Sequence, residues 1–148
     1  MDIEELDFED MELLSLHLAI TNLSLASIHG AEGKLDKAIM EYSKALEFDP
    51  NLYMGYVARS RLFKRKGEPH KALADLSRAI HLEPAVPGTY LWRGDIYLEQ
   101  GDSLAARRDY QTALQLAPAN PEAVRRLKLL KGHKSGEKKA PRRKQDKS

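Results

Sequence analysis

The chain has 148 residues, of which 42% are hydrophobic and 31% are charged, and this composition is typical of one folded, helix-rich domain. It contains no cysteine, which excludes disulfides, thiolate chemistry and cysteine-based zinc sites and favours an intracellular location, in the cytoplasm or the nucleus. The net charge of +2 conceals an acidic segment at one end of the chain and a basic segment at the other.

The N-terminal segment, residues 1–12, is acidic and contains neither Lys nor Arg. Its acids are Asp2, Glu4, Glu5, Asp7, Glu9, Asp10 and Glu12. We expect a solvated tail that leads into the first helix, because chain termini are usually mobile. The alternative is that its apolar residues Ile3, Leu6, Phe8 and Met11 let the segment fold back into a binding groove as an internal mimic of a partner.

The stretch from Leu13 to Ala31 carries no formal charge and is about long enough to cross a bilayer. Polar side chains interrupt it, among them Ser15, His17 and Asn22. Acidic rather than basic residues precede it, which is wrong for a secretory signal. The sequence therefore predicts a helix of a folded domain and no insertion into a membrane.

The centre of the chain repeats itself every 34 residues without an insertion. Glycine is expected to allow the turn between two helices, alanine to let helix backbones approach closely, and proline to stop the second helix of each unit. A period of this length indicates a protein of stacked helical repeats. Five columns carry the pattern: Gly33, Gly67 and Gly101; Ala38, Ala72 and Ala106; Ala45, Ala79 and Ala113; Leu46, Ile80 and Leu114; and Pro50, Pro84 and Pro118.

These columns resemble the tetratricopeptide repeat family over residues 19 to 120. The third unit fits best, with Arg93 in place of the usual Leu; its matching residues are Tyr90, Gly94, Tyr97, Ala106, Tyr110 and Pro118. In the second unit Arg59 is the same departure, and in the first unit Asn22 and His29 replace the expected aromatics. The resemblance implies an all-α, right-handed α-solenoid.

The predicted repeat domain spans residues 13–131. Its three helix-turn-helix repeats cover residues 19–52, 53–86 and 87–120, and a C-terminal capping helix covers residues 121–131. Proline at the start of the cap suits a first helical turn, and we expect Arg125, Arg126 and Lys128 to face solvent.

The family resemblance implies a concave groove lined by the first helix of each repeat, where a peptide segment or helix of another protein binds. The candidate groove residues are Leu23, Met54, Val57, Arg61, Lys64, Arg65, Leu91, Trp92 and Asp95. Aromatic and arginine side chains most often anchor interfaces, so we expect a partner with apolar and acidic residues. The alternatives are that Trp92 and Met54 pack against a neighbouring helix and that the basic residues form a solvated face.

The best-known activity of the family is a clamp of Lys, Asn and Arg side chains that grips the terminal carboxylates of chaperone tails. The corresponding positions of this chain hold Leu23, Ser27, Ala58, Gly88 and Trp92. Because none of these side chains is a cation, the carboxylates would be desolvated without a partner. We therefore expect an adaptor or scaffold that is not of the carboxylate-clamp type.

The C-terminal segment, residues 132–148, is expected to be a disordered basic tail, because it lacks large apolar residues. Its clusters suit nuclear import or salt-sensitive contact with nucleic acid, which makes a nucleic-acid-associated accessory factor the alternative function. A tail that only aids solubility, and self-association through the ends of the repeat array, also remain open. The basic residues are Lys138, Lys139, Arg142, Arg143 and Lys144.

We expect no catalysis, no cofactor and no metal. The five histidines lack the paired spacing of a metal site, and no phosphate-binding glycine loop or nucleophile motif occurs. Glu41, Asp75 and Asp109 recur with the repeat, which we interpret as a solvated helix face rather than as acid/base groups.

Overall fold

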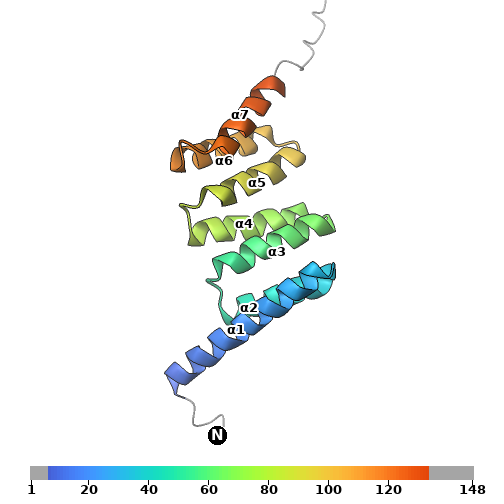
Figure 1. Cartoon of the computed structure of the whole chain (residues 1–148), viewed down its shortest axis with the longest axis vertical. Helices are drawn as coiled ribbons and strands as arrows, with labels where there is room; N and C mark the ends of the chain where they lie inside the picture. Colours follow the sequence, from blue (N-terminus) through green and yellow to red (C-terminus); the bar gives the residue numbers. More distant parts are fainter. Residues whose placement is uncertain (1–6, 134–148) are drawn as a thin grey trace, which may run out of the picture.

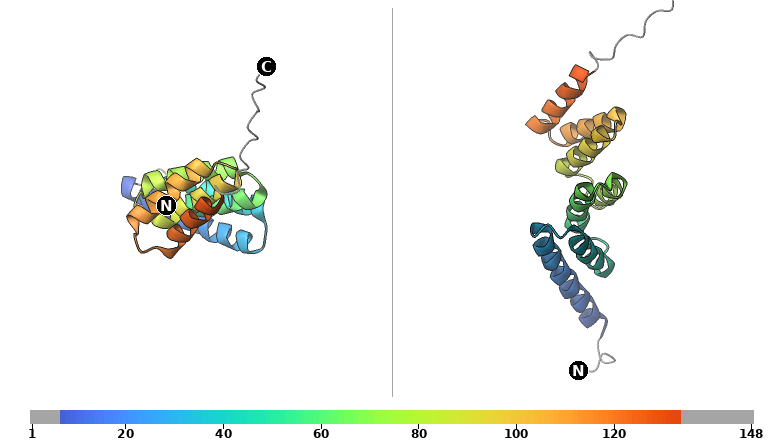
Figure 2. Two further views of the ribbon diagram at one scale, coloured as in Figure 1. Left: turned by 90° about the horizontal axis from the view of Figure 1, so that it is seen from above. Right: turned by 90° about the vertical axis from the view of Figure 1, so that its right-hand side faces the viewer.

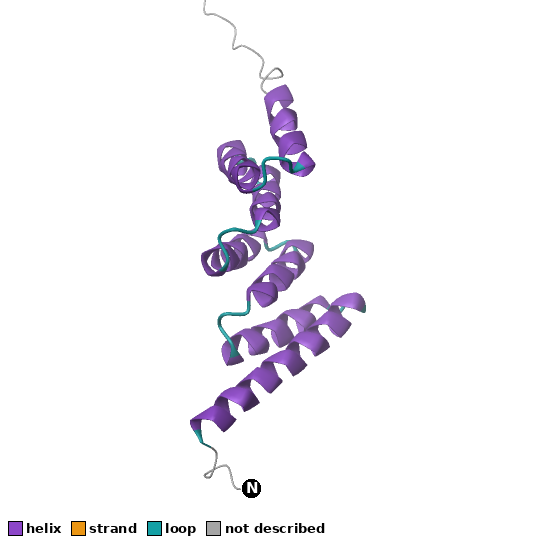
Figure 3. Cartoon of the chain, turned by 60° about the vertical axis from the view of Figure 1, so that its left-hand side comes forward, coloured by secondary structure: helices purple, strands orange, loops and turns teal. Residues whose placement is uncertain are grey.

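A computed structural model describes residues 7–133, and within this range the chain is folded entirely into α-helices joined by short loops (Figure 1, Figure 3). The predicted all-α fold is therefore confirmed. The helices are α1 (Phe8–Ala31), α2 (Leu35–Phe48), α3 (Tyr53–Lys66), α4 (Pro69–Leu82), α5 (Pro87–Glu99), α6 (Ser103–Leu116) and α7 (Pro121–His133).

The helices form three hairpins that stack one upon the next. Helices α1 and α2, α3 and α4, and α5 and α6 make the closest pairs, and α7 packs on α6. The hairpins follow one another along the long axis of the molecule, with α1 at one end and α7 at the other (Figure 1, Figure 2). This is the architecture of an α-solenoid, in which each unit buries its apolar face on its neighbours.

Each hairpin turns at a glycine in the left-handed region of backbone space. Gly33, Gly67 and Gly101 have φ values of 75°, 82° and 83°, and no other residue between 7 and 133 has a positive φ. A side chain at these positions would be strained, because only glycine adopts this conformation at little cost. The prediction that these three glycines mark the hairpin turns is confirmed.

Small side chains fill the crossings between the two helices of each repeat. The alanine columns of the second helices are wholly buried: Ala38, Ala45, Ala72, Ala79, Ala106 and Ala113. On the first helices the facing positions hold Ala26, Ser60 and Gly94, which are also buried. With so little side chain between them, the helix backbones approach closely and pack at the density of a protein core.

Tyrosines of the first helices attach the loops between repeats. The hydroxyl of Tyr56 donates a hydrogen bond to the carbonyl oxygen of Pro50 at 3.0 Å, and that of Tyr90 donates to Pro84 at 2.7 Å. The two bonds are separated by one repeat. The aromatic column thus fixes the loop that follows each second helix, a role that Asn22 does not have in the first repeat.

Helix α1 begins earlier than expected. The carboxylate of Asp7 accepts a hydrogen bond from the backbone N–H of Asp10 at 2.9 Å, and Glu9 and Asp10 lie in the first turn, where acids favour a helix N-terminus. The assignment of residues 8–12 to a tail is therefore wrong. With 24 residues, α1 extends beyond the 14-residue α2 (Figure 1), and only its Ala19 and Ala26 are buried.

Replacing Gly94 with alanine tests the close crossing of α5 and α6. A Cβ at this position would lie 2.5 Å from Cε1 of Tyr110 and 3.3 Å from the carbonyl oxygen of Ala106, so the helices would have to separate. We expect Gly94→Ala to lower the free energy of unfolding by about 1–3 kcal/mol, the usual range for overpacking, in urea titrations followed by circular dichroism.

Gly88→Ala in the same helix is the matched control, because a Cβ at that position meets nothing within 4 Å. It should leave the stability unchanged or raise it slightly, since alanine is the better helix former. Equal stability of the Gly94 and Gly88 variants would contradict the proposed crossing.

Candidate functional site

The first helices α1, α3 and α5 carry the candidate groove residues, and the structure separates these residues by exposure. Met54 is 66% exposed, and Arg61 and Arg65 are also exposed. Leu23, Lys64, Trp92 and Asp95 are half-buried. Val57 and Leu91 are buried, and Leu91 belongs to the core around Tyr110. The surface that a partner can reach is therefore narrower than the sequence pattern suggested, because Val57 and Leu91 support it from beneath.

Trp92 lies at the joint between α3 and α5. Its indole Nε1–H donates a hydrogen bond to Oγ of Ser60 at 3.2 Å, and the wholly buried Ser60 hydroxyl in turn donates to the carbonyl oxygen of Val57 at 2.7 Å. Nζ of Lys64 stands 4.9 Å from the centroid of the indole ring, within the range of a cation–π contact. Trp92 thus packs against a neighbouring helix while part of its ring stays exposed.

Lys64 is already paired within the molecule. Its ammonium group lies 2.8 Å from Oε1 of Glu99 on α5. This ion pair neutralises Lys64 and joins α3 to α5 on the same side as Trp92. Arg61 and Arg65 are the exposed arginines of α3, and neither forms a salt bridge with residues 7–133.

Asp95 is held by groups of its own chain. It accepts a hydrogen bond from the hydroxyl of Tyr110 at 2.8 Å and two from Arg126, at 2.7 Å and 2.8 Å. Burial, and then the bond to Asp95, raises the pKa of Tyr110, so the phenol remains protonated and donates. The bond to Asp95 raises the pKa of Arg126. Asp95 therefore fixes the cap α7 on α5. Arg126 is half-buried in this ion pair, so the expectation that it faces solvent is wrong.

Two arginines of the first helices form forked ion pairs that the sequence reading missed. Arg59 donates two hydrogen bonds to the carboxylate of Asp75, at 2.8 Å and 2.7 Å, and a third to Oγ of Ser43 in the preceding repeat at 3.0 Å. Each fork therefore joins three helices. Its bonds to the carboxylate raise the pKa of Arg59.

The same fork recurs one repeat later. Arg93 bonds Asp109 at 2.8 Å and 2.7 Å and Ser77 at 3.1 Å, and the bonds to Asp109 raise the pKa of Arg93. The replacement of the family's usual Leu by Arg thus has a physical reason in both repeats. In the first repeat Leu25 stands at the corresponding position, and the fork is not formed there.

The interpretation of the recurring carboxylates as a solvated helix face is wrong. Glu41, Asp75 and Asp109 are all buried, with exposed fractions of 8%, 5% and 4%. The signal was present in the sequence, because an arginine precedes each aspartate by sixteen residues in two consecutive repeats. Burial could not be read from this spacing, since it depends on how the helices cross.

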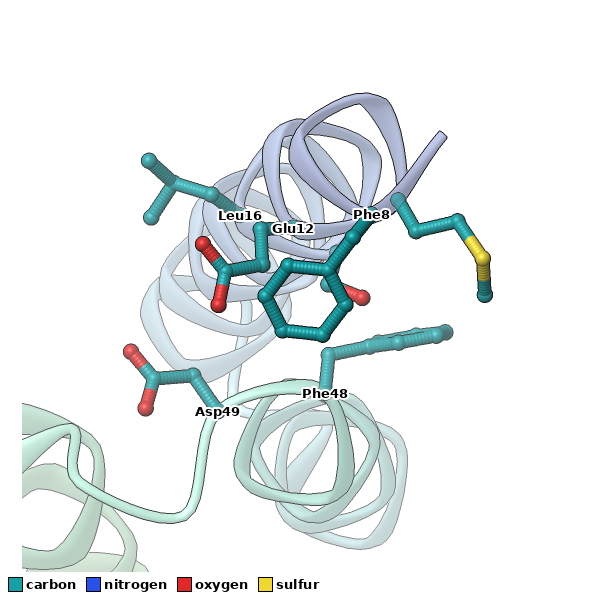
Figure 4. Close-up of a pocket in the computed structure, with 7 residues that line it drawn as sticks. Phe8, Glu12, Leu16, Phe48 and Asp49 are labelled. Carbon is teal, nitrogen blue, oxygen red and sulfur yellow. The ribbon is translucent and has the colours of Figure 1, made fainter. Parts of the chain in front are cut away.

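A shallow hollow of about 490 Å³ lies at the free end of α1 (Figure 4). The rings of Phe8 and Phe48 lie near each other with their planes steeply inclined, and the carboxylates of Glu12 and Asp49 lie to one side of them. Met11 and Leu16 also line it. Phe8 and Met11, which the sequence allowed as a groove mimic, therefore belong to the first turns of α1, whereas Ile3 and Leu6 lie outside the described residues.

The remaining sequence predictions concern catalysis and the basic tail. Between residues 7 and 133, no group of three His, Asp or Glu side chains is placed to hold a metal ion. The tail residues lie outside the described part of the chain: Lys138, Lys139, Arg142, Arg143 and Lys144.

Comparison with known proteins agrees with this architecture. The model of the tetratricopeptide repeat-like domain family matches residues 8–131. None of the curated proteins matches the sequence.

Solved structures of the same architecture cover most of the chain. The first repeat domain of Spaghetti (RPAP3) bound to the HSP90 peptide SRMEEVD is 24% identical, with a TM-score of 0.73, over 81% of this chain and 95% of that chain. The second repeat domain of human RPAP3 in complex with the HSP70 peptide SGPTIEEVD is 25% identical, with a TM-score of 0.72, over 79% and 98%. The Arabidopsis OM64 domain is 22% identical, with a TM-score of 0.72, over 80% and 98%.

The buried fork between Arg93 and Asp109 predicts a stability loss on shape-preserving substitution. Asp109→Asn removes the charge that balances a guanidinium whose side chain is only 20% exposed. We expect the free energy of unfolding in urea to fall by about 2 kcal/mol, and most of it to return when Arg93→Leu and Asp109→Leu are combined.

Glu99→Gln is the control, because the carboxylate of Glu99 is 54% exposed and its pair with Lys64 should contribute about 0.5 kcal/mol or less. If Asp109→Asn costs no more than Glu99→Gln, the forks do not hold the repeats together.

Proposed function

Because the chain belongs to the tetratricopeptide repeat-like domain family, we propose that it is a non-catalytic adaptor that holds a segment of another protein on the surface formed by α3 and α5. The partner segment carries apolar side chains and carboxylates. The observation that supports this proposal is a strip of accessible side chains along the two helices: Met54, Arg61 and Arg65 of α3 are exposed, and Trp92 of α5 is half-buried.

The apolar part of the strip suits an anchoring side chain. Met54 is a flexible side chain that adapts to a partner, and tryptophan is among the residues that contribute most to binding at interfaces. Trp92 is held in place by Ser60 and Lys64, so little conformational entropy is lost when a partner covers its free part.

The charged part of the strip favours an acidic partner. Neither Arg61 nor Arg65 forms a salt bridge with residues 7–133, whereas Lys64 and Lys66 are paired with Glu99 and Asp36. Two unpaired guanidinium groups on one helix attract carboxylates and can bind them in a bidentate manner. Asp95, bound to Arg126, contributes support and no contact with the partner.

The human RPAP3 domain, which binds an HSP70 peptide, supports the use of this fold for peptide binding. In this chain the positions that correspond to the family's carboxylate clamp carry no cation. Ser27 and Gly88 are exposed, and Leu23, Ala58 and Trp92 are half-buried. The proposed partner is therefore not the acidic C-terminal tail of a chaperone.

A titration with the peptide SGPTIEEVD tests the exclusion of chaperone tails. Trp92 is the single tryptophan, so its fluorescence reports on the proposed surface directly. We expect no saturable change up to about 1 mM peptide, because a carboxylate that loses water without gaining a cation binds weakly. The second repeat domain of human RPAP3 is the positive control.

Micromolar binding that disappears when the terminal carboxylate of the peptide is amidated would show that this chain grips such tails by other residues.

Selection from a displayed peptide library tests the binding surface itself. Peptides enriched on the intact chain should contain apolar and acidic residues, and their affinity should fall at least about tenfold with Arg61→Glu combined with Arg65→Glu. Arg78→Glu with Arg108→Glu, two exposed changes on the second helices α4 and α6, is the charge-matched control.

Trp92→Ala should weaken the same peptides. Because the indole also bonds to Ser60 between α3 and α5, affinities are compared at a temperature where circular dichroism shows that the variant is folded. If the peptides bind the variant with Arg61→Glu and Arg65→Glu as tightly as they bind the intact chain, α3 is not part of the binding surface.

A further inference from the structure

Helix α1 exposes an apolar face that the other two repeats bury. Ile28, Leu62 and Ile96 occupy the same column of the repeat, and their exposed fractions are 54%, 6% and 0%. Ile96 is covered by the preceding repeat, where it packs with Phe63 and Leu76. Among residues 7–133 nothing lies over the corresponding face of α1, which therefore has the shape and chemistry of a stacking surface without its neighbour.

The exposed face has the spacing of a helix-pairing seam. We define the α1 seam as the exposed residues Met11, Leu14, Leu18, Thr21, Leu25 and Ile28. Steps of three and four alternate along it, which is the heptad spacing that keeps one stripe facing a partner helix. None of the seam residues belongs to the proposed binding surface on α3 and α5.

Polar side chains of α1 donate hydrogen bonds to backbone carbonyl oxygens of the same helix. The Thr21 hydroxyl donates to the carbonyl oxygen of His17 at 2.9 Å, Asn22 donates to Leu18 at 2.8 Å, and Ser24 donates to Ile20 at 3.0 Å. Such local bonds satisfy donors that would otherwise require water. The helix can therefore be covered along the seam without leaving the Thr21 hydroxyl unpaired.

We propose that the seam is covered by the α1 seam of a second copy of this chain, with the two helices antiparallel. The centre of the seam falls between Leu18 and Thr21, so reversing the direction of the helix maps the seam onto itself. Met11 of one copy then packs on Ile28 of the other, Leu14 on Leu25, and Leu18 on Thr21. This is a self-complementary, two-fold interface that closes as a dimer.

The charges of α1 select the antiparallel arrangement. Glu9, Asp10 and Glu12 lie at one end of a helix that has no Lys or Arg. A parallel pair would bring the two acidic ends together, whereas the antiparallel pair separates the two copies of Asp10 by roughly 28 Å along the helix axis, since Asp10 of one copy lies opposite residue 29 of the other. It also brings each acidic end towards the end of the other copy where the exposed Lys37 follows α1. Lys34 at that end is already paired with Glu32.

A bilayer is the competing occupant of the same face, since α1 is long and apolar enough to cross one. Its acidic end argues against this choice, because anionic lipid headgroups repel carboxylates and no Lys or Arg of α1 is present to anchor the helix at the headgroups. The seam residues of two copies would bury on the order of 1,000 Å², the lower end of the range for specific interfaces, which fits a reversible dimer.

Disulfide trapping between two single variants tests both the contact and its direction. The chain has no cysteine, so Met11→Cys and Ile28→Cys each introduce a unique thiol. When the two variants are mixed and oxidised, with one of them enlarged by a tag, we expect the mixed disulfide to dominate over both homodimers, because a disulfide requires Cα atoms within about 7 Å. Cross-linking of Met11→Cys with itself would overturn the antiparallel arrangement, and no cross-link in any mixture would overturn the contact.

Sedimentation equilibrium of the full chain tests the dimer without cross-linking. We expect a reversible dimer at tens of micromolar, with a dissociation constant that rises at least about tenfold in Leu18→Glu combined with Leu25→Glu. Leu104→Glu with Leu116→Glu on α6, where the leucines are 66% and 40% exposed and lie off the seam, should leave it unchanged. Circular dichroism verifies that both variants remain folded.

Three results would overturn the proposal: a monomer at every concentration, equal weakening by the α6 control, or binding of the intact chain to phosphatidylcholine vesicles in place of dimerisation. The seam and the surface on α3 and α5 share no residue. A variant that no longer dimerises should therefore still bind peptides, and the two proposals can fail independently.

Discussion

The close approach of the two helices in each repeat is the constraint on which the other contacts depend. Where α5 crosses α6, Gly94 leaves room for the ring of Tyr110, and a single methyl group at that position would lie 2.5 Å from the ring. The ring can then reach Asp95 with its hydroxyl, and Asp95 can hold Arg126 of the cap. A residue without a side chain thus determines where a buried phenol, a carboxylate and the last helix lie, since each contact positions the next one.

Polar contacts then fix one repeat relative to the next on two sides of the stack. On one side Arg59 and Arg93 each bond the aspartate of their own repeat and a serine of the preceding one, which joins consecutive second helices; the pairs are Asp75 with Ser43 and Asp109 with Ser77. On the other side Trp92 bonds to Ser60 and Lys64 pairs with Glu99. Buried ion pairs contribute little net stability but penalise other arrangements, because a guanidinium without its carboxylate is costly. The surface between α3 and α5 is therefore formed before any partner arrives.

The sequence predicts the repeat architecture because its requirements are local. Gly33, Gly67 and Gly101 are needed for positive φ, and the alanine columns are needed wherever backbones meet, so both recur at the interval of the repeat. The role of Asp109 could not be predicted from its own position, because burial results from the crossing of three helices. Likewise Val57 and Leu91 have the spacing of surface residues, yet the neighbouring helices cover them. The acids before Leu13 suit a tail and a helix N-terminus equally well, and only the Asp7 cap distinguishes the two.

The contact of Trp92 with Ser60 tests the stacking of repeats most directly, because it joins the first helices of consecutive repeats through two residues that are 32 positions apart in the sequence. The indole N–H of the single tryptophan gives one resolved proton resonance. In a nuclear Overhauser experiment on the intact chain, the stacked arrangement predicts cross-peaks from this proton to the side chain of Ser60 and slow exchange with water. An indole proton that exchanges rapidly and shows no cross-peak to any residue of α3 would contradict the register of the repeats and the binding surface built on it.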